Sequence, residues 1–215
     1  MKINEDIFNI EVLNAIEKID KLDIIFSNEE VKQIEEVAKS ICGYSTDNRT
    51  KYIIKKNTFQ GFAGQNAVAK KLEKFIVKDE IRKSNNYHEW KENETQFGDI
   101  RFLKKYMRGG KLEIKSIGLT DLYFDKDPST FFQFKYQQLV DACTPGPKKS
   151  QYFLITKVKV IELFKHYQVT ASVLFQTHKA LSYINRNKGN HFMTGKMHYD
   201  SLLISNGIHK KETYL

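Results

Sequence analysis

The sequence has little cysteine, no long hydrophobic run and no phosphate-loop pattern. Its two cysteines, Cys42 and Cys143, are far apart and match no metal-ligand spacing, so a reducing, cytosolic setting fits. No apolar signal run opens the chain and no stretch has transmembrane length, so we expect a cytoplasmic protein with no membrane partner. Gly61 and Gly64 are not followed by the G-K-[ST] of a phosphate loop, which excludes that nucleotide site.

The charge is unevenly distributed along the 215 residues. The chain has a formal net charge of +9, but residues 1–40 hold 5 lysines and 10 acidic residues, a net of −5, which leaves +14 for residues 41–215. A region this basic indicates a polyanionic partner, most simply nucleic acid. The alternative is that the lysines only solvate the surface. Hydrophobic residues make up 40% of the chain, which is enough for the core of one sizeable domain.

A β-hairpin is predicted at residues 98–117. Residues 98–103 and 111–117 alternate with the period of two that is typical of a strand. The polar turn between them, 104–110, ends in two glycines, which tolerate the positive φ that a tight turn needs. Asp99, Glu113 and Lys115 all lie in this segment.

Three charged side chains are expected to meet on one face of the hairpin. Glu113 and Lys115 are two residues apart and so share a face, while the other face is predicted to carry Leu112, Ile114 and Ile117. Asp99 opens the neighbouring strand, where it can come beside Glu113. Carboxylates are ligands that Mg²⁺ prefers, and a lysine beside them can hold a water or stabilise charge on a phosphate. The simpler alternative is an exposed hairpin with a surface Glu–Lys pair.

This arrangement resembles the PD-(D/E)XK nuclease superfamily, which includes many restriction endonucleases. The resemblance rests on Gly98-Asp99, thirteen intervening residues and Glu113-Ile114-Lys115, with Gly98 in place of the family's proline. The order of predicted elements agrees with it: helix 61–77, strands 87–92, 98–103 and 111–117, helix 131–143 and strand 151–160. This αβββαβ order, over about residues 59–160, is that of the superfamily's α/β (α+β) core, a mixed sheet flanked by helices.

The resemblance implies a Mg²⁺-dependent, sequence-specific endodeoxyribonuclease, most like a type II restriction enzyme that acts on double-stranded DNA as a homodimer. Asp99, Glu113 and the backbone carbonyl of Ile114 would bind one or two Mg²⁺ ions, for which Mn²⁺ would substitute. Lys115 would position the attacking water. In the superfamily, the helix before the hairpin often supplies a further carboxylate near the metal. The matching position here is Gln65, which either binds a metal-bound water through its carbonyl oxygen or is only a residue at the start of the helix.

Other functions are compatible with the same residues. A repair, transposon or phage nuclease shares this core. With either kind of nuclease we expect the protein to be intracellular and of prokaryotic or viral origin. A non-catalytic DNA-binding protein is favoured only by the amide of Gln65. An unrelated α/β domain with a charged surface hairpin is the third possibility.

The remaining segments are predicted to extend the core. Residues 1–43 form an acidic helical element, with helices over 4–21 and 31–41 and a capping box of Ser27 and Glu30. Residues 44–215 form the nuclease domain, whose C-terminal addition is a candidate for reading DNA. Its predicted elements are a short helix at 161–165, a strand at 166–174 and a helix at 177–184.

Basic and amide side chains are the candidates for DNA contact. Residues 45–57 are predicted to form a short strand or a loop near phosphates, and the loop 185–191 is rich in the side chains that read base edges, or is simply a turn. The predicted contact residues are Lys55, Lys56, Lys104, Lys105, Arg108, Lys135, Arg186, Asn187 and Lys188.

Overall fold

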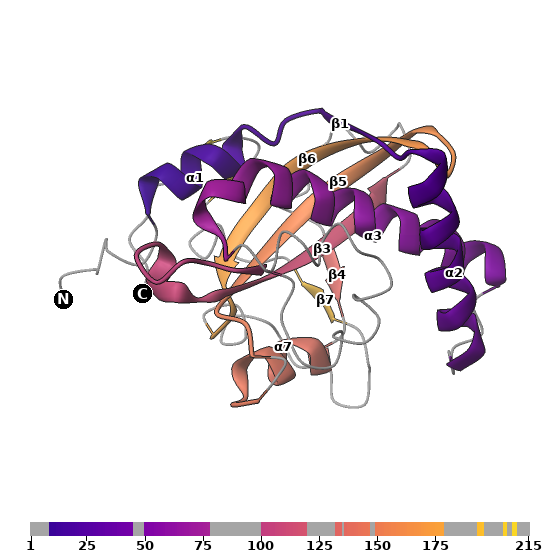
Figure 1. The fold of residues 1–215 in the computed structure, drawn as a ribbon. Coiled ribbons are helices and arrows are strands. Elements are labelled where there is room, and N and C mark those ends of the chain that lie inside the picture. The colour runs from indigo at the N-terminus through magenta and orange to yellow at the C-terminus, as the bar shows by residue number, and fades with distance from the viewer. Residues whose placement is uncertain are drawn as a thin grey trace.

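A mixed β-sheet with helices on both faces organises the chain (Figure 1). The computed structural model describes residues 9–44, 50–77, 100–119, 132–134, 136–146, 149–178, 193–195, 204–205 and 208–209. Its helices are α1 (Ile10–Glu17), α2 (Asn28–Tyr44), α3 (Lys51–Leu72) and α7 (Tyr136–Cys143). Its strands are β1 (Leu22–Ile25), β2 (Ile100–Arg101), β3 (Lys111–Leu119), β4 (Phe132–Phe134), β5 (Tyr152–Glu162), β6 (His166–Gln176), β7 (Met193–Gly195), β8 (Ile204–Ser205) and β9 (Ile208–His209). None of the helices in these ranges is both long and apolar enough to cross a lipid bilayer.

The main sheet combines antiparallel and parallel pairs. Among the described residues it has seven strands in the order β2-β3-β5-β6-β8-β9, with β1 also paired to β6. β2 runs antiparallel to β3, β3 parallel to β5, and β5 antiparallel to β6. A parallel pair needs a crossover connection, and α7 lies in the segment that joins β3 to β5. β4 and β7 form a separate antiparallel pair.

Helix α3 covers one face of the sheet, where its apolar side chains share a core with alternate residues of β3 and β5. That core includes Phe62, Ala63, Ala67, Val68, Leu72, Leu112, Ile114, Leu154 and Val158. The helix comes closest at Gly64, where an added Cβ would overlap Ser116 Oγ and lie 2.8 Å from Thr156 Oγ1. Ser116 and Thr156 hydroxyls are themselves 3.1 Å apart, so the two strands present a polar pair to the bare helix backbone.

Gly64→Ala is therefore expected to destabilise the protein, while Gly61→Ala serves as the matched control. A Cβ at Gly61, in the same helix, would have no atom within 4 Å. Overpacking against the sheet costs about 1–3 kcal/mol, whereas alanine at an open helical position gains about 0.5–1 kcal/mol. Urea unfolding followed by circular dichroism measures both variants, and equal free energies of unfolding would contradict the close contact at Gly64.

The opposite face of the sheet is also covered. Phe153 and Ile155 alternate along β5 with the residues that face α3, and they are nevertheless fully buried. Figure 1 places α7 on this side of the sheet, and its Ala142 is buried. The sheet therefore lies between two layers, as the α/β prediction requires.

The N-terminal segment shares the main core. β1 pairs with β6 from Leu22↔Val169 to Ile25↔His166, and Val12 and Ile16 of α1 belong to the same hydrophobic cluster as α3. The predicted capping box of α2 is confirmed. The Ser27 N–H donates to Glu30 Oε2 at 2.7 Å and the Glu30 N–H donates to Ser27 Oγ at 3.2 Å.

Two predictions around α3 are wrong. Within residues 45–57, the described part from Lys51 onward is helix and not a strand or loop, and Thr50 caps it by accepting from the Ile53 N–H at 3.3 Å. The predicted helix 61–77 is the second half of α3, which ends at Leu72 and continues as a 3-10 turn, Glu73–Phe75. A glycine weakens a helix interior, but the close packing of α3 against β3 and β5 offsets that cost at Gly64.

Two further segments differ from prediction. The start of the predicted helix 131–143 is strand β4, which pairs with β7, and the helix itself begins at Tyr136. The predicted short helix 161–165 is the end of β5 followed by a turn into β6. The predicted strands 151–160 and 166–174 are confirmed as β5 and β6. The predicted strand 87–92 and most of the helix 177–184 lie outside the described residues.

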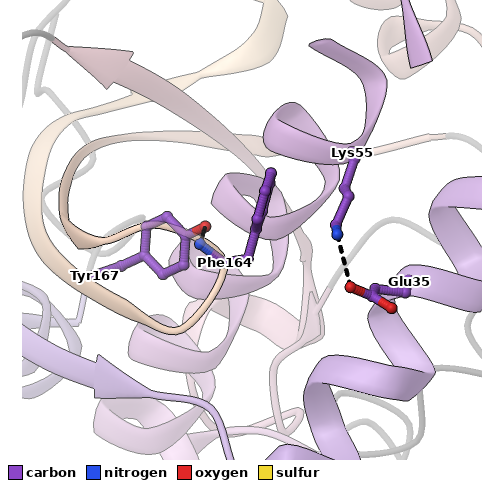
Figure 2. A network of polar contacts seen from close by, with 4 residues as sticks. All are labelled: Glu35, Lys55, Phe164 and Tyr167. Carbon is purple, nitrogen blue, oxygen red and sulfur yellow. Dashed lines mark hydrogen bonds and ion pairs between the residues drawn. The ribbon is translucent and has the colours of Figure 1, made fainter. Parts of the chain in front are cut away.

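Phe164 holds the turn between β5 and β6 (Figure 2). Its φ of 64° is rare for a bulky side chain, and its N–H donates to Tyr167 Oη at 3.0 Å. Burial raises the pKa of Tyr167 to about 12, so this phenol stays protonated at neutral pH. The Lys55 ammonium lies 4.2 Å from the Phe164 ring centroid and 2.6 Å from Glu35 Oε1, which joins α2, α3 and the turn.

Candidate active site on strand β3

Antiparallel pairing of β2 with β3 forms the predicted hairpin. The register is Ile100↔Leu112 and Arg101↔Lys111, and the Phe102 N–H donates to the Gly110 carbonyl at 3.0 Å. The antiparallel direction is as predicted. The extents differ: in the described part of the predicted strand 98–103, β2 covers only Ile100–Arg101, and β3 continues past the predicted 111–117 to Leu119. The second strand of the hairpin, β3, carries Glu113 and Lys115 and lies between β2 and β5 in the sheet.

The hairpin turn uses one of its two predicted glycines for a left-handed backbone. Gly109 has φ 67°, whereas Gly110 has φ −66°. Met107 and Arg108 also have positive φ, at 46° and 54°. Gly110 is needed for a different reason, because a Cβ there would lie 2.6 Å from Tyr152 Cε2.

Glu113 and Lys115 lie side by side on one face of β3. Lys115 Nζ is 2.9 Å from Glu113 Oε1, and their side chains are 30% and 23% exposed. Both are thus partly buried and still open to solvent. Since the register of β3 with β5 runs without a break, Ile117 also lies on this face, and not with Leu112 and Ile114 as predicted.

Gln65 belongs to the helix on the other side of the sheet. It follows Gly64, whose contact with Ser116 shows that α3 covers the face opposite to Glu113. Gln65 is half-buried there. The fold therefore brings Glu113 and Lys115 together, and a role for Gln65 at a metal stays a prediction.

The other predicted site residues are divided among several places. Lys104, Lys105 and Arg108 are exposed on the hairpin turn. Lys55 and Lys56 lie near the start of α3, and Lys55 is already paired with Glu35. Asp99, Lys135, Arg186, Asn187 and Lys188 lie outside the residues described, as does Gly98.

Lys157 is a residue that the sequence interpretation missed. It lies opposite Ile117 in the parallel β3–β5 pair, so it shares the face of Glu113 and Lys115, and it is only 4% exposed. The signal that could have identified it is a lysine within the apolar run of a predicted strand. Lysine is almost never fully buried unless it is paired, so a lysine at a buried strand position points to a polar or charged partner. Two lysines therefore lie on the face that carries Glu113.

Glu113 contributes one carboxylate to this face. In the ranges that the structure describes, no group of three or more His, Cys, Asp or Glu side chains is placed to hold a metal ion. Comparison of the chain with protein-family models, curated proteins and solved structures found no match. The function is therefore argued from the chemistry of the site itself.

Proposed function

We propose that the chain is a Mg²⁺-dependent endodeoxyribonuclease whose hydrolytic site is formed by Glu113, Lys115 and Asp99. The observation that carries the proposal is the 2.9 Å contact between the Lys115 ammonium and the Glu113 carboxylate on a partly buried face of β3 that is still open to solvent. Leaving aside β4, which precedes α7 and pairs outside the main sheet, the order is α3, β2, β3, α7, β5. This order, with β3 parallel to β5, is in keeping with the PD-(D/E)XK core that the motif resembles.

The strand register supports the inclusion of Asp99. Ile100 pairs with Leu112 in the antiparallel hairpin, so a continuation by one residue would set Asp99 opposite Glu113. Residues directly opposite in an antiparallel pair point to the same face. Two carboxylates and the Ile114 carbonyl fit a hard divalent cation, because Mg²⁺ is usually held by one or two carboxylates together with water and substrate phosphate.

The side chains have distinct roles in this proposal. A divalent cation at Asp99 and Glu113 would supply charge neutralisation at the phosphate and a more acidic water. Lys115 keeps an ammonium group beside that position, where it can hold the attacking water or donate to a phosphate oxygen as negative charge builds. Water adds to phosphorus and the P–O3′ bond breaks, so no protein nucleophile is needed. The resemblance implies a 5′-phosphate product.

Addition and removal of the metal test the proposal directly. We expect purified protein with phage DNA to give cleavage in Mg²⁺ or Mn²⁺ and none in EDTA. Discrete bands on a gel would support a site-specific, restriction-type enzyme, and a smear would support a repair or phage nuclease. A retarded DNA band without cleavage under any metal would overturn the nuclease proposal in favour of a DNA-binding protein.

A further inference from the structure

A shallow hollow lies between α1 and the end of α3, away from the Glu113 face. Its volume is about 300 Å³, at the lower end of the range of small-ligand sites. Ala15 and the buried ring of Phe75 form the apolar part of its wall. The polar part comes from α1 and from the end of α3, through Glu11, Asn14, Lys18, Lys71 and Lys74.

The hollow has an excess of positive charge. Three lysines and one glutamate line it, so it carries a net of two positive charges. In the described part of the chain, neither Lys18 nor Lys71 is within ion-pair distance of a carboxylate. The Lys74 ammonium lies 4.7 Å from the centroid of the Phe75 ring, which keeps it at the hollow. Like charges around one hollow repel each other, and an anion placed between them would relieve that repulsion.

The positive surface continues from the hollow to the hairpin turn. The Phe75 and Tyr106 rings meet edge to face, with centroids 4.9 Å apart, and the Lys105 ammonium lies 4.9 Å from the Tyr106 centroid. The Leu103 N–H donates to the Phe75 carbonyl at 2.8 Å, which fixes the turn against the end of α3. Glu113 is three residues beyond Gly110, about 10 Å along the strand.

We propose that this lysine hollow binds phosphate groups of the nucleic acid strand that the candidate active site cuts. The assignment to a strand rests on the proposed function, while the phosphate chemistry follows from the hollow itself. Lys18, Lys71 and Lys74 contact phosphate oxygens, and the deoxyribose lies against the partly exposed Ala15. A free nucleotide phosphate has the same chemistry, so the test compares the two sources.

The test uses the full-length triple variant Lys18→Gln, Lys71→Gln, Lys74→Gln in EDTA, where no cleavage occurs. Fluorescence anisotropy with a labelled 25-base-pair duplex is expected to show affinity weakened about tenfold or more. The slope of log affinity against log salt concentration is expected to fall by the equivalent of about two to three phosphate contacts. The matched control is the triple variant Lys32→Gln, Lys39→Gln, Lys165→Gln. It makes the same charge change on α2 and in the turn between β5 and β6, and we expect less than a twofold effect.

A second arm titrates the same proteins with 2′-deoxyadenosine 5′-monophosphate by calorimetry. Loss of duplex affinity in the hollow variant alone supports a strand phosphate at this site. Loss of mononucleotide binding with unchanged duplex affinity overturns the assignment to a strand. Unchanged affinity for both probes overturns the phosphate site, as does a lower melting temperature with unchanged affinity, because the lysines would then only complement the carboxyl end of α3.

Failure of the proposed function gives a different pattern. The wild type would bind the duplex and the hollow variant would bind it more weakly, yet Mg²⁺ would produce no cleavage at saturating DNA. The single variant Lys74→Gln repeats both arms with the least change to folding, since Lys74 is exposed. A two- to fivefold weaker duplex affinity is expected for it, and an unchanged affinity would contradict the proposal.

Discussion

Glu113→Gln is expected to lower the rate of Mg²⁺-dependent DNA cleavage by about 100- to 1,000-fold or more. The substitution keeps the shape of the side chain and removes its negative charge, so it removes a metal ligand and the partner of the Lys115 ammonium 2.9 Å away. Asp99→Ala is expected to give a loss of the same size. Cleavage of a plasmid under single-turnover conditions measures both variants.

The same substitution is expected to leave DNA affinity in EDTA within a few fold, because Glu113 does not attract phosphates. A matched control is Glu162→Gln. Glu162 Oε1 lies 3.9 Å from Lys165 Nζ, and its side chain is 62% exposed at the far end of β5. We expect this control to cleave at the wild-type rate.

A purely structural role for the Glu113–Lys115 pair makes a different prediction. Partly exposed ion pairs contribute about 0–1 kcal/mol, so Glu113→Gln would lower the melting temperature slightly and leave the cleavage rate intact. Full activity of Glu113→Gln or of Asp99→Ala would therefore overturn the assignment of the active site.

Phe59→Ala is expected to destabilise the protein by about 3–5 kcal/mol, the largest effect on stability that we predict. The Phe59 ring is fully buried and contacts the rings of Phe26, Phe164 and Tyr167 at centroid distances of 5.8, 5.2 and 6.5 Å. Removing it leaves a cavity where α3, β6 and the chain after β1 meet. Because many domains are stable by only about 5–15 kcal/mol, this single change consumes much of that margin.

Urea unfolding followed by circular dichroism measures the loss. Ile53→Ala, on the same helix, is the control, because Ile53 is 41% exposed and its truncation should cost less than about 1 kcal/mol. Phe59→Leu is expected to fall between the two, since it removes less volume. A free energy of unfolding for Phe59→Ala within 1 kcal/mol of the wild type would contradict the central position of this ring.

Local signals in the sequence predicted the elements that depend on local physics. The alternation over residues 151–160 corresponds to β5, and the capping box of Ser27 and Glu30 has both of its hydrogen bonds. The adjacency of Glu113 and Lys115 follows from the period of two in a strand. Each of these depends on residues within a few positions of each other.

Features that depend on distant partners could not be predicted. β1 is only four residues long and becomes a strand because β6 pairs with it. β4 lies inside the segment 131–143, whose pattern predicts a helix, and its partner is β7, about 60 residues later. The position of Gln65 depends on which face of the sheet α3 covers, and the helical periodicity of α3 does not contain that information.

The pairing of β1 with β6 has a consequence for synthesis of the chain. The Lys21 N–H donates to Thr170 Oγ1 across a separation of 149 residues, so α1 and β1 leave the ribosome long before their partner strand exists. At about 5–20 residues per second, the delay is on the order of 10 s. During that time the apolar side chains of Val12, Ile16 and Ile24 lack their native neighbours. α1 and β1 are thus expected to be among the last elements to dock, although they are made before β6, and to need protection until β6 has formed.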